Sequence, residues 1–287
     1  LDGFDLEWIE APLSDPTSLT RAFDGCERVY HCAAVTSLLS RPTPTLVAAN
    51  VTGTANVMEA CRAAGVARLV HTSSTVAVGV SDDGTPCTEA HRWNLPEHGL
   101  DDGYATTKRQ AEELVIEAVS AGRIDAVVVN PGFMFGALDA RPSSGRMIVE
   151  VAAGRGRVGT PGRNSFSNVR SVADGMVRAG DSGKSGERYI LAGENLSYFE
   201  VFSRIAGVIG RRPPLVQPPR WLARPVGWFG DLRELTADPR IMARWQPDPL
   251  VVLKGGVGAF HQSPSGDELD ESFGNPDLHS ESARHWS

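Results

Sequence analysis

Two side chains four residues apart have the chemistry for proton transfer. Tyr104 and Lys108 open a stretch with helical periodicity, and this separation places both on one face of a helix. A neighbouring cation favours the phenolate and lowers the pKa of a phenol from its usual value of about 10. The pair is therefore suited to general acid–base catalysis beside a hydride carrier, although a tyrosine four residues before a lysine is by itself a common pattern.

The segments around this pair give it a context. Residues 68–72 predict a short buried strand, and a pair of serines that ends with Ser74 follows at its carboxyl end. The helical periodicity from Tyr104 stops at Gly122, and residues 124–130 predict the next strand. In open parallel sheets, ligands bind at the carboxyl ends of the strands. We therefore expect the serine hydroxyls and the tyrosine to converge at one edge of a parallel sheet.

The same alternation extends toward the amino terminus. Residues 28–34 predict a strand that ends in small residues, where a ligand can approach the backbone closely. Apolar residues at gaps of three and four predict a helix from Val47 to about Gly65. Residues 6–10 predict an earlier strand, and a helix follows that begins at Pro16. Such alternation implies right-handed crossovers and a Rossmann-like, doubly wound parallel α/β sheet.

The ordered motifs of the chain resemble those of the extended short-chain dehydrogenases/reductases, also called NAD-dependent epimerases/dehydratases. The resemblance runs from about residue 6 to about residue 210. The motifs are His31-Cys32-Ala33-Ala34, Asn50-Val51-Thr52-Gly53-Thr54, Thr72-Ser73-Ser74, Tyr104 to Lys108, Asn130-Pro131-Gly132 and Val169-Arg170-Ser171-Val172-Ala173-Asp174. Their shared order is far more specific than any one of them. Residues 186–197 look most like the dihydroflavonol-reductase-like branch.

The resemblance implies a role for each site residue. Tyr104 would be the general acid/base, Lys108 would lower its pKa and hold the nicotinamide ribose, and Ser74 would hydrogen-bond the substrate oxygen. The implied cofactor is NAD or NADP, which carries the hydride while the protein supplies orientation and proton transfer. The residues implied to contact the cofactor are Leu13, Ala33, Ala34, Asn50, Thr72, Tyr104, Lys108, Pro131 and Phe133.

The amino-terminal part departs from the family pattern. Members begin with a strand, a glycine-rich turn and a helix whose amino terminus binds the cofactor pyrophosphate. This chain begins at Leu1, just before what matches the third strand, so we expect that roughly fifty residues with the glycine-rich segment are missing. Pro12 stands where the family usually carries an Asp that contacts adenine. The glycine-rich stretches 154–159 and 255–258 do not lie between a strand and a helix, and both are expected to be loops.

Composition agrees with a small-molecule enzyme. The 287 residues are 41% hydrophobic and 22% charged, enough to bury a sizeable core. With 35 acidic and 28 basic residues the net charge is −7, which argues against a nucleic-acid partner. The sequence contains no run of 18 apolar residues, so we expect no membrane span. The four cysteines lack paired or metal-ligand spacing, so we expect buried thiols, no metal site and a cytoplasmic location. For the assembly we consider a homodimer.

We expect three regions along the chain. Residues 1–136 form an incomplete NAD(P)-binding domain. Residues 137–261 form a substrate-binding or lid region, in which a segment near 164–192 returns to the sheet and residues 220–245 are helical. Residues 262–287 have little periodicity and are expected to form an irregular tail.

The sequence thus predicts an NAD(P)-dependent oxidoreductase that acts on a secondary alcohol or ketone through Ser74, Tyr104 and Lys108. Two alternatives stay open. A nucleotide-sugar epimerase or dehydratase would return the hydride to the same substrate. A non-catalytic relative would bind a dinucleotide or a protein partner as a sensor. The intact site residues argue against the sensor, whereas Pro12 and the missing glycine-rich segment favour lost activity in this shortened chain.

Overall fold

The chain divides into two compact units in the computed structural model. The first consists of Leu1–Ala137 and Arg163–Leu196, and the second of Leu138–Gly162 and Ser197–Ser287. The structure describes residues 7–36, 41–137, 139, 144–156, 159 and 162–217, together with the backbone of three strands at 240–248, 251–262 and 281–286.

A parallel sheet forms the centre of the first unit. Its strands are β1 (Arg28–His31), β2 (Arg68–Thr72), β3 (Ala126–Pro131) and β6 (Arg188–Leu191), which lie in the order β1-β2-β3-β6. All three pairings are parallel. The segment that contains β6 therefore returns to the sheet after the chain has left it.

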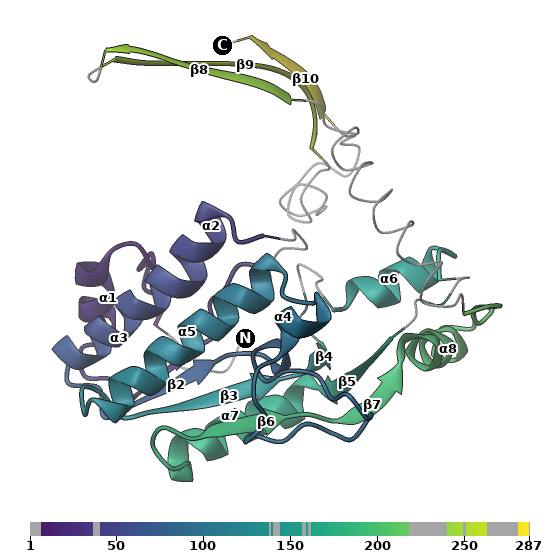
Figure 1. Ribbon diagram of the computed structural model, residues 1–287, viewed down its shortest axis with the longest axis horizontal. Helices are drawn as coiled ribbons and strands as arrows, with labels where there is room; N and C mark the ends of the chain where they lie inside the picture. Colours follow the sequence, from purple (N-terminus) through teal and green to yellow (C-terminus); the bar gives the residue numbers. More distant parts are fainter. Residues whose placement is uncertain are drawn as a thin grey trace. The chain divides into compact units, whose positions relative to one another are not determined.

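Helices cover both faces of this sheet (Figure 1). The helices α1 (Pro16–Ala22), α3 (Gly53–Ala63) and α5 (Gly103–Ser120) lie on one face, and α7 (Val169–Ser182) lies on the other. Side chains alternate along each strand, so Leu69 and Val128 pack toward α3 and α5 while Val70 and Val127 pack toward α7. The sheet and its two helical layers confirm the predicted Rossmann-like α/β fold.

The helix α5 is the element on which Tyr104 and Lys108 lie. It begins after Asp102, whose carboxylate accepts a hydrogen bond from the backbone N–H of Ala105 at 2.7 Å. Its buried residues include a stripe at helical spacing, which consists of Ala105, Lys108, Ala111, Glu112, Val115 and Ala118; Gly103 and Thr107 are buried as well. Two charged residues thus stand in an otherwise apolar stripe. The helix ends before Gly122, which adopts a φ of 66° that favours glycine.

The helix that precedes β2 contains a wider segment. It begins with α2 (Pro44–Leu46), continues through a π-helical segment at Val47–Thr52 and runs on as α3. Thr43 caps its start, since its hydroxyl accepts from the N–H of Leu46 at 3.2 Å. Gly65 follows its end with a φ of 69°. The predicted helix is therefore present, with a π segment that the periodicity did not indicate.

A second, smaller sheet continues from β3. It contains β4 (Phe133–Phe135), β5 (Arg163–Asn168) and β7 (Glu194–Ser197) in the order β4-β5-β7. Gly132 joins β3 to β4 where a Cβ atom would lie 2.6 Å from the carbonyl oxygen of Ser165. Only glycine therefore allows the two backbones to approach this closely. Two short helical segments complete the first unit, η2 (Thr75–Ala77) and α4 (Leu95–His98).

The described residues of the second unit form two helices and an antiparallel sheet. The helices α6 (Arg146–Ala152) and α8 (Tyr198–Val208) contact one another. A capping box begins α8, with Ser197 and Glu200 exchanging hydrogen bonds. The strands β8 (Arg240–Asp248), β9 (Val251–Gln262) and β10 (Glu281–Trp286) lie in the order β10-β9-β8. None of the helices in the described ranges is long and apolar enough to cross a membrane.

The predicted strand at 6–10 is wrong. Residues 7–10 form no strand, and 82% of Trp8 and 52% of Ile9 are exposed. A strand needs a neighbour for its backbone hydrogen bonds, and within the described residues none pairs with this stretch. Residue 6 lies outside the described residues.

The carboxyl-terminal part also differs from expectation. Residues 240–245 lie in β8 and not in a helix, residues 255–258 lie in β9 and not in a loop, and β10 interrupts the tail expected to be irregular. Each of these strands forms through pairing with another segment, which local periodicity does not report. The remaining parts of the expected lid and tail, at 220–239 and 263–280, lie outside the described residues.

Candidate functional site

Three side chains of the predicted site converge at the carboxyl end of β2. Ser74 follows this strand in extended backbone, and Tyr104 lies in the first turn of α5. A hydrogen bond joins the Ser74 and Tyr104 side chains. One turn along α5, Nζ of Lys108 donates a hydrogen bond of 2.6 Å to the carbonyl oxygen of Thr72, the last residue of β2. The helix and the strand end therefore hold a serine, a tyrosine and a lysine together.

Burial sets the protonation of the two proton-carrying groups. It raises the pKa of Tyr104, while the hydrogen bond with Ser74 opposes this rise and Asp102 adds to it. Burial also lowers the pKa of Lys108 to about 8, against the opposite effects of Glu112 and Cys32. At neutral pH the phenol is protonated and can donate a proton.

The pKa of Tyr104 is raised in this structure, although Lys108 was expected to lower it. The Lys108 ammonium group is directed to the Thr72 carbonyl, and the loss of hydration on burial is the largest effect on the phenol. Helical spacing correctly placed both groups on one side of α5. It did not indicate how strongly the surrounding protein would favour the neutral phenol.

Asn50 fixes the backbone that follows β1. Its Oδ1 accepts a hydrogen bond of 2.8 Å from the N–H of Val35, and its Nδ2 donates one of 2.9 Å to the carbonyl oxygen of the same residue. The Nδ2 group also donates to Oγ1 of Thr107 on α5, at 3.1 Å. Ala33 and Ala34, in this segment, are exposed. The π segment therefore connects the backbone after β1 to the helix of the predicted site.

A family model described as the NAD dependent epimerase/dehydratase family matches residues 2–192. The chain belongs to this family. The match covers the strands β1, β2, β3 and β6, together with the residues that converge around Ser74. The resemblance found in the motifs is thereby confirmed, and the cofactor of the family is NAD or NADP.

The chain is similar along most of its length to known members. It is 34% identical to sterol demethylase protein B of Methylococcus capsulatus over 259 residues, which cover 89% of this chain and 77% of that protein. It is 30% identical to a Synechocystis protein provisionally named dihydroflavonol 4-reductase, covering 89% and 72% of the two chains. The crystal structure of PA4631, a nucleoside-diphosphate-sugar epimerase from Pseudomonas aeruginosa, matches with a TM-score of 0.66 and 26% identity, over 77% and 68% of the chains. Dehydrogenases, reductases and epimerases are thus its relatives, and the chain is an enzyme of this kind.

The other residues expected to contact the cofactor lie outside this cluster. Leu13 lies against α3, where its carbonyl oxygen accepts a hydrogen bond of 2.7 Å from Nδ2 of Asn56. Pro131 is the buried last residue of β3. Phe133 begins β4, and its ring centroid lies 5.5 Å from that of Phe166.

The residues after β1 and on α5 fit the nicotinamide end of the epimerase/dehydratase cofactor. Ala33 and Ala34 present small exposed side chains on a backbone that Asn50 holds in place. Thr72 donates a hydrogen bond of 3.5 Å to Sγ of Cys32 and accepts one from Lys108, so the ends of β1 and β2 meet beside the lysine. A flat ring and a ribose can approach such a surface without meeting large side chains.

The expected buried thiols are only partly found. All four cysteines are free, but Cys26 and Cys32 are exposed, Cys61 is buried and Cys87 is half-buried. Cys26 lies in the turn between α1 and β1, and Cys32 directly follows β1, so neither thiol belongs to a helix or strand that could bury it.

Two histidines are buried side by side beneath the predicted site. His31 and His71 occupy paired positions of β1 and β2, and their ring centroids are 5.5 Å apart. Oγ1 of Thr54 donates to the carbonyl oxygen of Asn50, so it accepts from Nε2–H of His31 at 3.1 Å. Burial lowers the pKa of His31 to about 4 and that of His71 well below the usual value, and the charge of Lys108 acts in the same direction.

These histidines make stability depend on acidity. Because the pKa of His31 is about 4 when folded and 6.5 when unfolded, the unfolded chain binds more protons between these values. The free energy of unfolding should therefore be fully present above pH 6.5 and fall by about 3 kcal/mol for this residue as the pH drops to 4. Urea unfolding across this range measures it.

A His31→Gln variant keeps a donor for Thr54 and removes the titrating group, so it should lose part of the slope of stability against pH. His98→Gln is the matched control, because the His98 side chain is partly exposed and its Nε2 lies 3.1 Å from Oδ1 of Asp82. An equal slope in wild type and His31→Gln would contradict the assignment.

The sequence did not indicate a hydrogen-bond network that surrounds Glu112. The carboxylate of Glu112 is fully buried and contacts Asn130 and Arg188, which lie on β3 and β6. The signal that could have found it is a charged residue on the buried face of α5, four residues after Lys108.

Proposed function

We propose that this chain is an NAD(P)-dependent oxidoreductase that interconverts a secondary alcohol and a ketone at Ser74, Tyr104 and Lys108. One observation carries the proposal. The hydroxyls of Ser74 and Tyr104 share a hydrogen bond at the end of β2, one helical turn from a buried lysine. An oxygen atom of a substrate that contacts both hydroxyls can receive a proton from one of them.

In the direction of reduction, Tyr104 donates its proton to the carbonyl oxygen of the ketone as that oxygen becomes a hydroxyl. Ser74 hydrogen-bonds the same oxygen and fixes its position. The reduced cofactor, when bound, supplies the hydride that reaches the carbonyl carbon. Lys108 has a pKa of about 8, so below this pH its positive charge stabilises the phenolate that Tyr104 leaves behind. In the reverse direction the phenolate takes the proton of the alcohol.

We infer that the substrate is a ketone or secondary alcohol carried on a ring system. The names of the two similar proteins, a sterol demethylase component and a dihydroflavonol 4-reductase, support this class. Residues 1–136 are proposed to bind the cofactor, and residues 137–261 to recognise the substrate. The net charge of −7 supports a small molecule over a nucleic acid, and four free cysteines support the cytoplasm as location.

The test is an assay of the purified protein with NADH or NADPH and a set of ketones that includes a 3-ketosteroid and a dihydroflavonol. Loss of reduced nicotinamide that requires the ketone supports the proposal. The nucleotide-sugar epimerase stays a second candidate, because the PA4631 structure is 26% identical. Conversion of a nucleotide sugar such as UDP-glucose without net change of the cofactor would favour it. Cofactor binding without turnover of any of these compounds would favour the sensor.

A further inference from the structure

A buried carboxylate lies behind the predicted catalytic residues. Glu112 is one turn beyond Lys108 on α5, and its side chain is 0% exposed. Its Oε2 accepts a hydrogen bond of 2.7 Å from Nδ2 of Asn130, and its Oε1 accepts one of 3.1 Å from Nη1 of Arg188. Nη1 of Arg109 lies 3.7 Å from Oε1. A carboxylate with these partners stays hydrogen-bonded although it is out of contact with water.

Asn130 connects this carboxylate to the segment that carries Ser74. Its Nδ2 donates to Glu112 and also to the carbonyl oxygen of Ser74, at 3.0 Å. Both partners are acceptors, so the amide can be oriented in only one way. The backbone of Ser74 is thus tied through one amide group to a carboxylate on α5, the helix that carries Tyr104. The network therefore ties the backbone of Ser74 to the helix that carries the Tyr104 hydroxyl.

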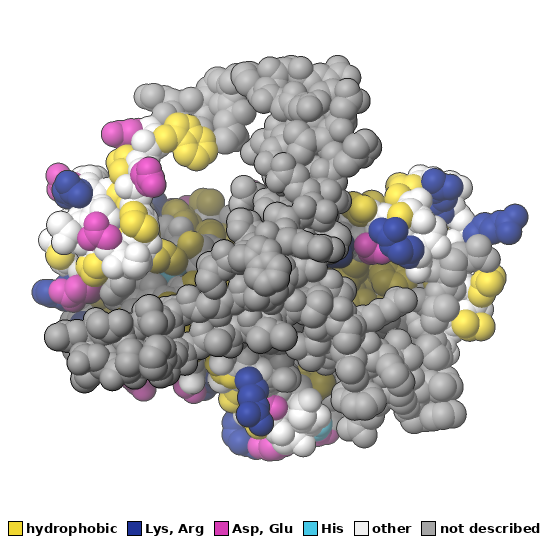
Figure 2. All heavy atoms as spheres, turned by 90° about the horizontal axis from the view of Figure 1, so that it is seen from above, with side chains coloured by type: hydrophobic (Ala, Val, Ile, Leu, Met, Phe, Trp, Pro, Cys, Tyr) yellow, Lys and Arg dark blue, Asp and Glu magenta, His cyan; other side chains and the backbone are white. Residues whose placement is uncertain are grey.

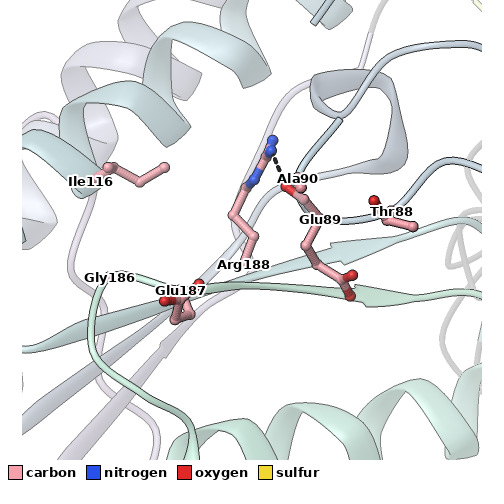
Figure 3. Close-up of a pocket in the computed structure, with 7 residues that line it drawn as sticks. All are labelled: Thr88, Glu89, Ala90, Ile116, Gly186, Glu187 and Arg188. Atoms are coloured by element: carbon pink, nitrogen blue, oxygen red, sulfur yellow. Dashed lines mark hydrogen bonds between the residues drawn. The ribbon is translucent and has the colours of Figure 1, made fainter. Parts of the chain in front are cut away.

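Arg188 anchors the other end of the network. Its guanidinium group reaches from β6 to Glu112 and to the carbonyl oxygens of Glu89 and His91. Figure 3 shows Arg188 directed toward Glu89. A cavity of about 380 Å³ lies beside it, lined by residues 88–90, Ile116 and residues 186–188. Because protein acceptors already bind the guanidinium, we assign it to Glu112 rather than to a ligand of this cavity.

Resting on the proposed function, we propose that Glu112 is a positioning residue, which holds Ser74 in place through Asn130 and provides the negative charge nearest Lys108 along α5. Buried ion pairs contribute little net stability, because desolvation offsets their attraction. A role in positioning gives a reason for a charge at this place.

Glu112 is one of several groups that interact electrostatically with Lys108. Cys32, after β1, also raises the pKa of Lys108. The charge of Lys108 in turn lowers the pKa of His31 and that of His71. Tyr104 lies one turn before Lys108 on α5. Glu112 is the largest of the effects that raise the pKa of Lys108 against burial. Without this charge the pKa of Lys108 should fall below about 8, and less of the lysine would be protonated at neutral pH.

The first experiment replaces Glu112 by glutamine. The volume is kept, but the single amide oxygen can accept from only one of Asn130 and Arg188. We expect kcat for the ketone to fall roughly tenfold with little change in KM, because Ser74 loses its fixed position in the transition state. The alkaline limb of the pH profile should move to lower pH. Glu113→Gln, which removes the same charge from an exposed pair with Arg109, is the matched control and should change neither.

A second variant separates position from charge. Asn130→Ala releases the Ser74 carbonyl and leaves the carboxylate of Glu112 in place. It should lower kcat to a similar degree while the pH profile stays at its original position. The double variant should fall no further than either single one, since both break the same connection. Additive losses would show that Glu112 does not act through Asn130 and would overturn the positioning role.

A measurement without substrate keeps the two proposals apart. The titration of the Lys108 side chain can be followed by NMR of 13C-labelled lysine, assigned with Lys108→Arg. Its midpoint should lie near 8 in the wild type and lower in Glu112→Gln. An unchanged midpoint would overturn the role of the charge even if no ketone is reduced, whereas a shifted midpoint in an inactive protein would count against the proposed function alone. Should Glu112→Gln not fold, Glu112→Asp, which keeps the charge, should keep the wild-type midpoint.

Discussion

Replacing Tyr104 by phenylalanine should lower kcat by at least about 10²-fold, the usual cost of removing a general acid/base. The hydroxyl that shares a hydrogen bond with Ser74 disappears, and the half-buried ring keeps its packing on α5. Affinity for NAD(P)H should change little, because Lys108 and the backbone after β1 are untouched. Steady-state kinetics with a ketone, together with a titration of the reduced cofactor, measure both.

The matched control is Tyr30→Phe, on β1, where the ring is 38% exposed. It should leave kcat at the wild-type value. Equal turnover in wild type and Tyr104→Phe would remove the phenol from the mechanism and move the chain toward the non-catalytic class. A parallel loss in both variants would point to a change in folding instead, which a thermal melt would reveal.

Replacing Asn50 by aspartate should cost about 3 kcal/mol of unfolding free energy, since it leaves polar groups unpaired and places a buried charge. The acid keeps an acceptor for the N–H of Val35, but it loses both donated bonds, to the Val35 carbonyl and to Thr107. A carboxylate would then face two oxygen atoms in a buried position. Cofactor affinity should fall as well, because the backbone of Ala33 and Ala34 is no longer held.

Asn56→Asp provides the control for this substitution. Asn56 lies on the next helical segment, α3, is only half-buried and donates a hydrogen bond of 2.7 Å to the carbonyl oxygen of Leu13. Denaturant unfolding should separate the two variants clearly. Equal stability losses would mean that Asn50 does not have the special position that its three hydrogen bonds indicate.

The parts of the fold that the sequence predicted are those with strong local periodicity. The buried stripe of α5 repeats at helical spacing, and β2 and β3 are short strands with buried centres. Once these elements are right, the parallel arrangement places Ser74 and Tyr104 at the same edge of the sheet. Spacing along the chain was therefore enough to bring the two hydroxyls together.

The failures concern features that depend on distant partners. Residues 7–10 have the composition of a strand but no neighbour within the described residues. Glu112 contacts Asn130 and Arg188 across 18 and 76 positions of the chain, a separation that no local pattern reports. The pKa of Tyr104 depends on how much protein surrounds the phenol, and spacing from Lys108 does not contain that information.

Charges of both signs lie close together on one described face of the molecule. In Figure 2 basic and acidic side chains occur next to apolar ones on the described part of the surface. Several of the charges form local pairs, such as Arg62 with Glu59 and Lys184 with Glu187. The net charge of the chain is therefore a weak guide to where a substrate binds.

The π segment at Val47–Thr52 determines how the side chains before it and those after it are rotated about the helix axis relative to one another. Before it ends, Asn50 faces the backbone after β1; beyond it, Val57 and Cys61 of α3 face the core. Deleting one residue there would restore a plain α-helix and rotate the side chains before the deletion by about 100° about the helix axis relative to those after it. Either the backbone after β1 or the core would then lose its contacts. Evolution can therefore exchange residue types in this stretch more easily than it can change their number, so its length should vary less among relatives than its composition.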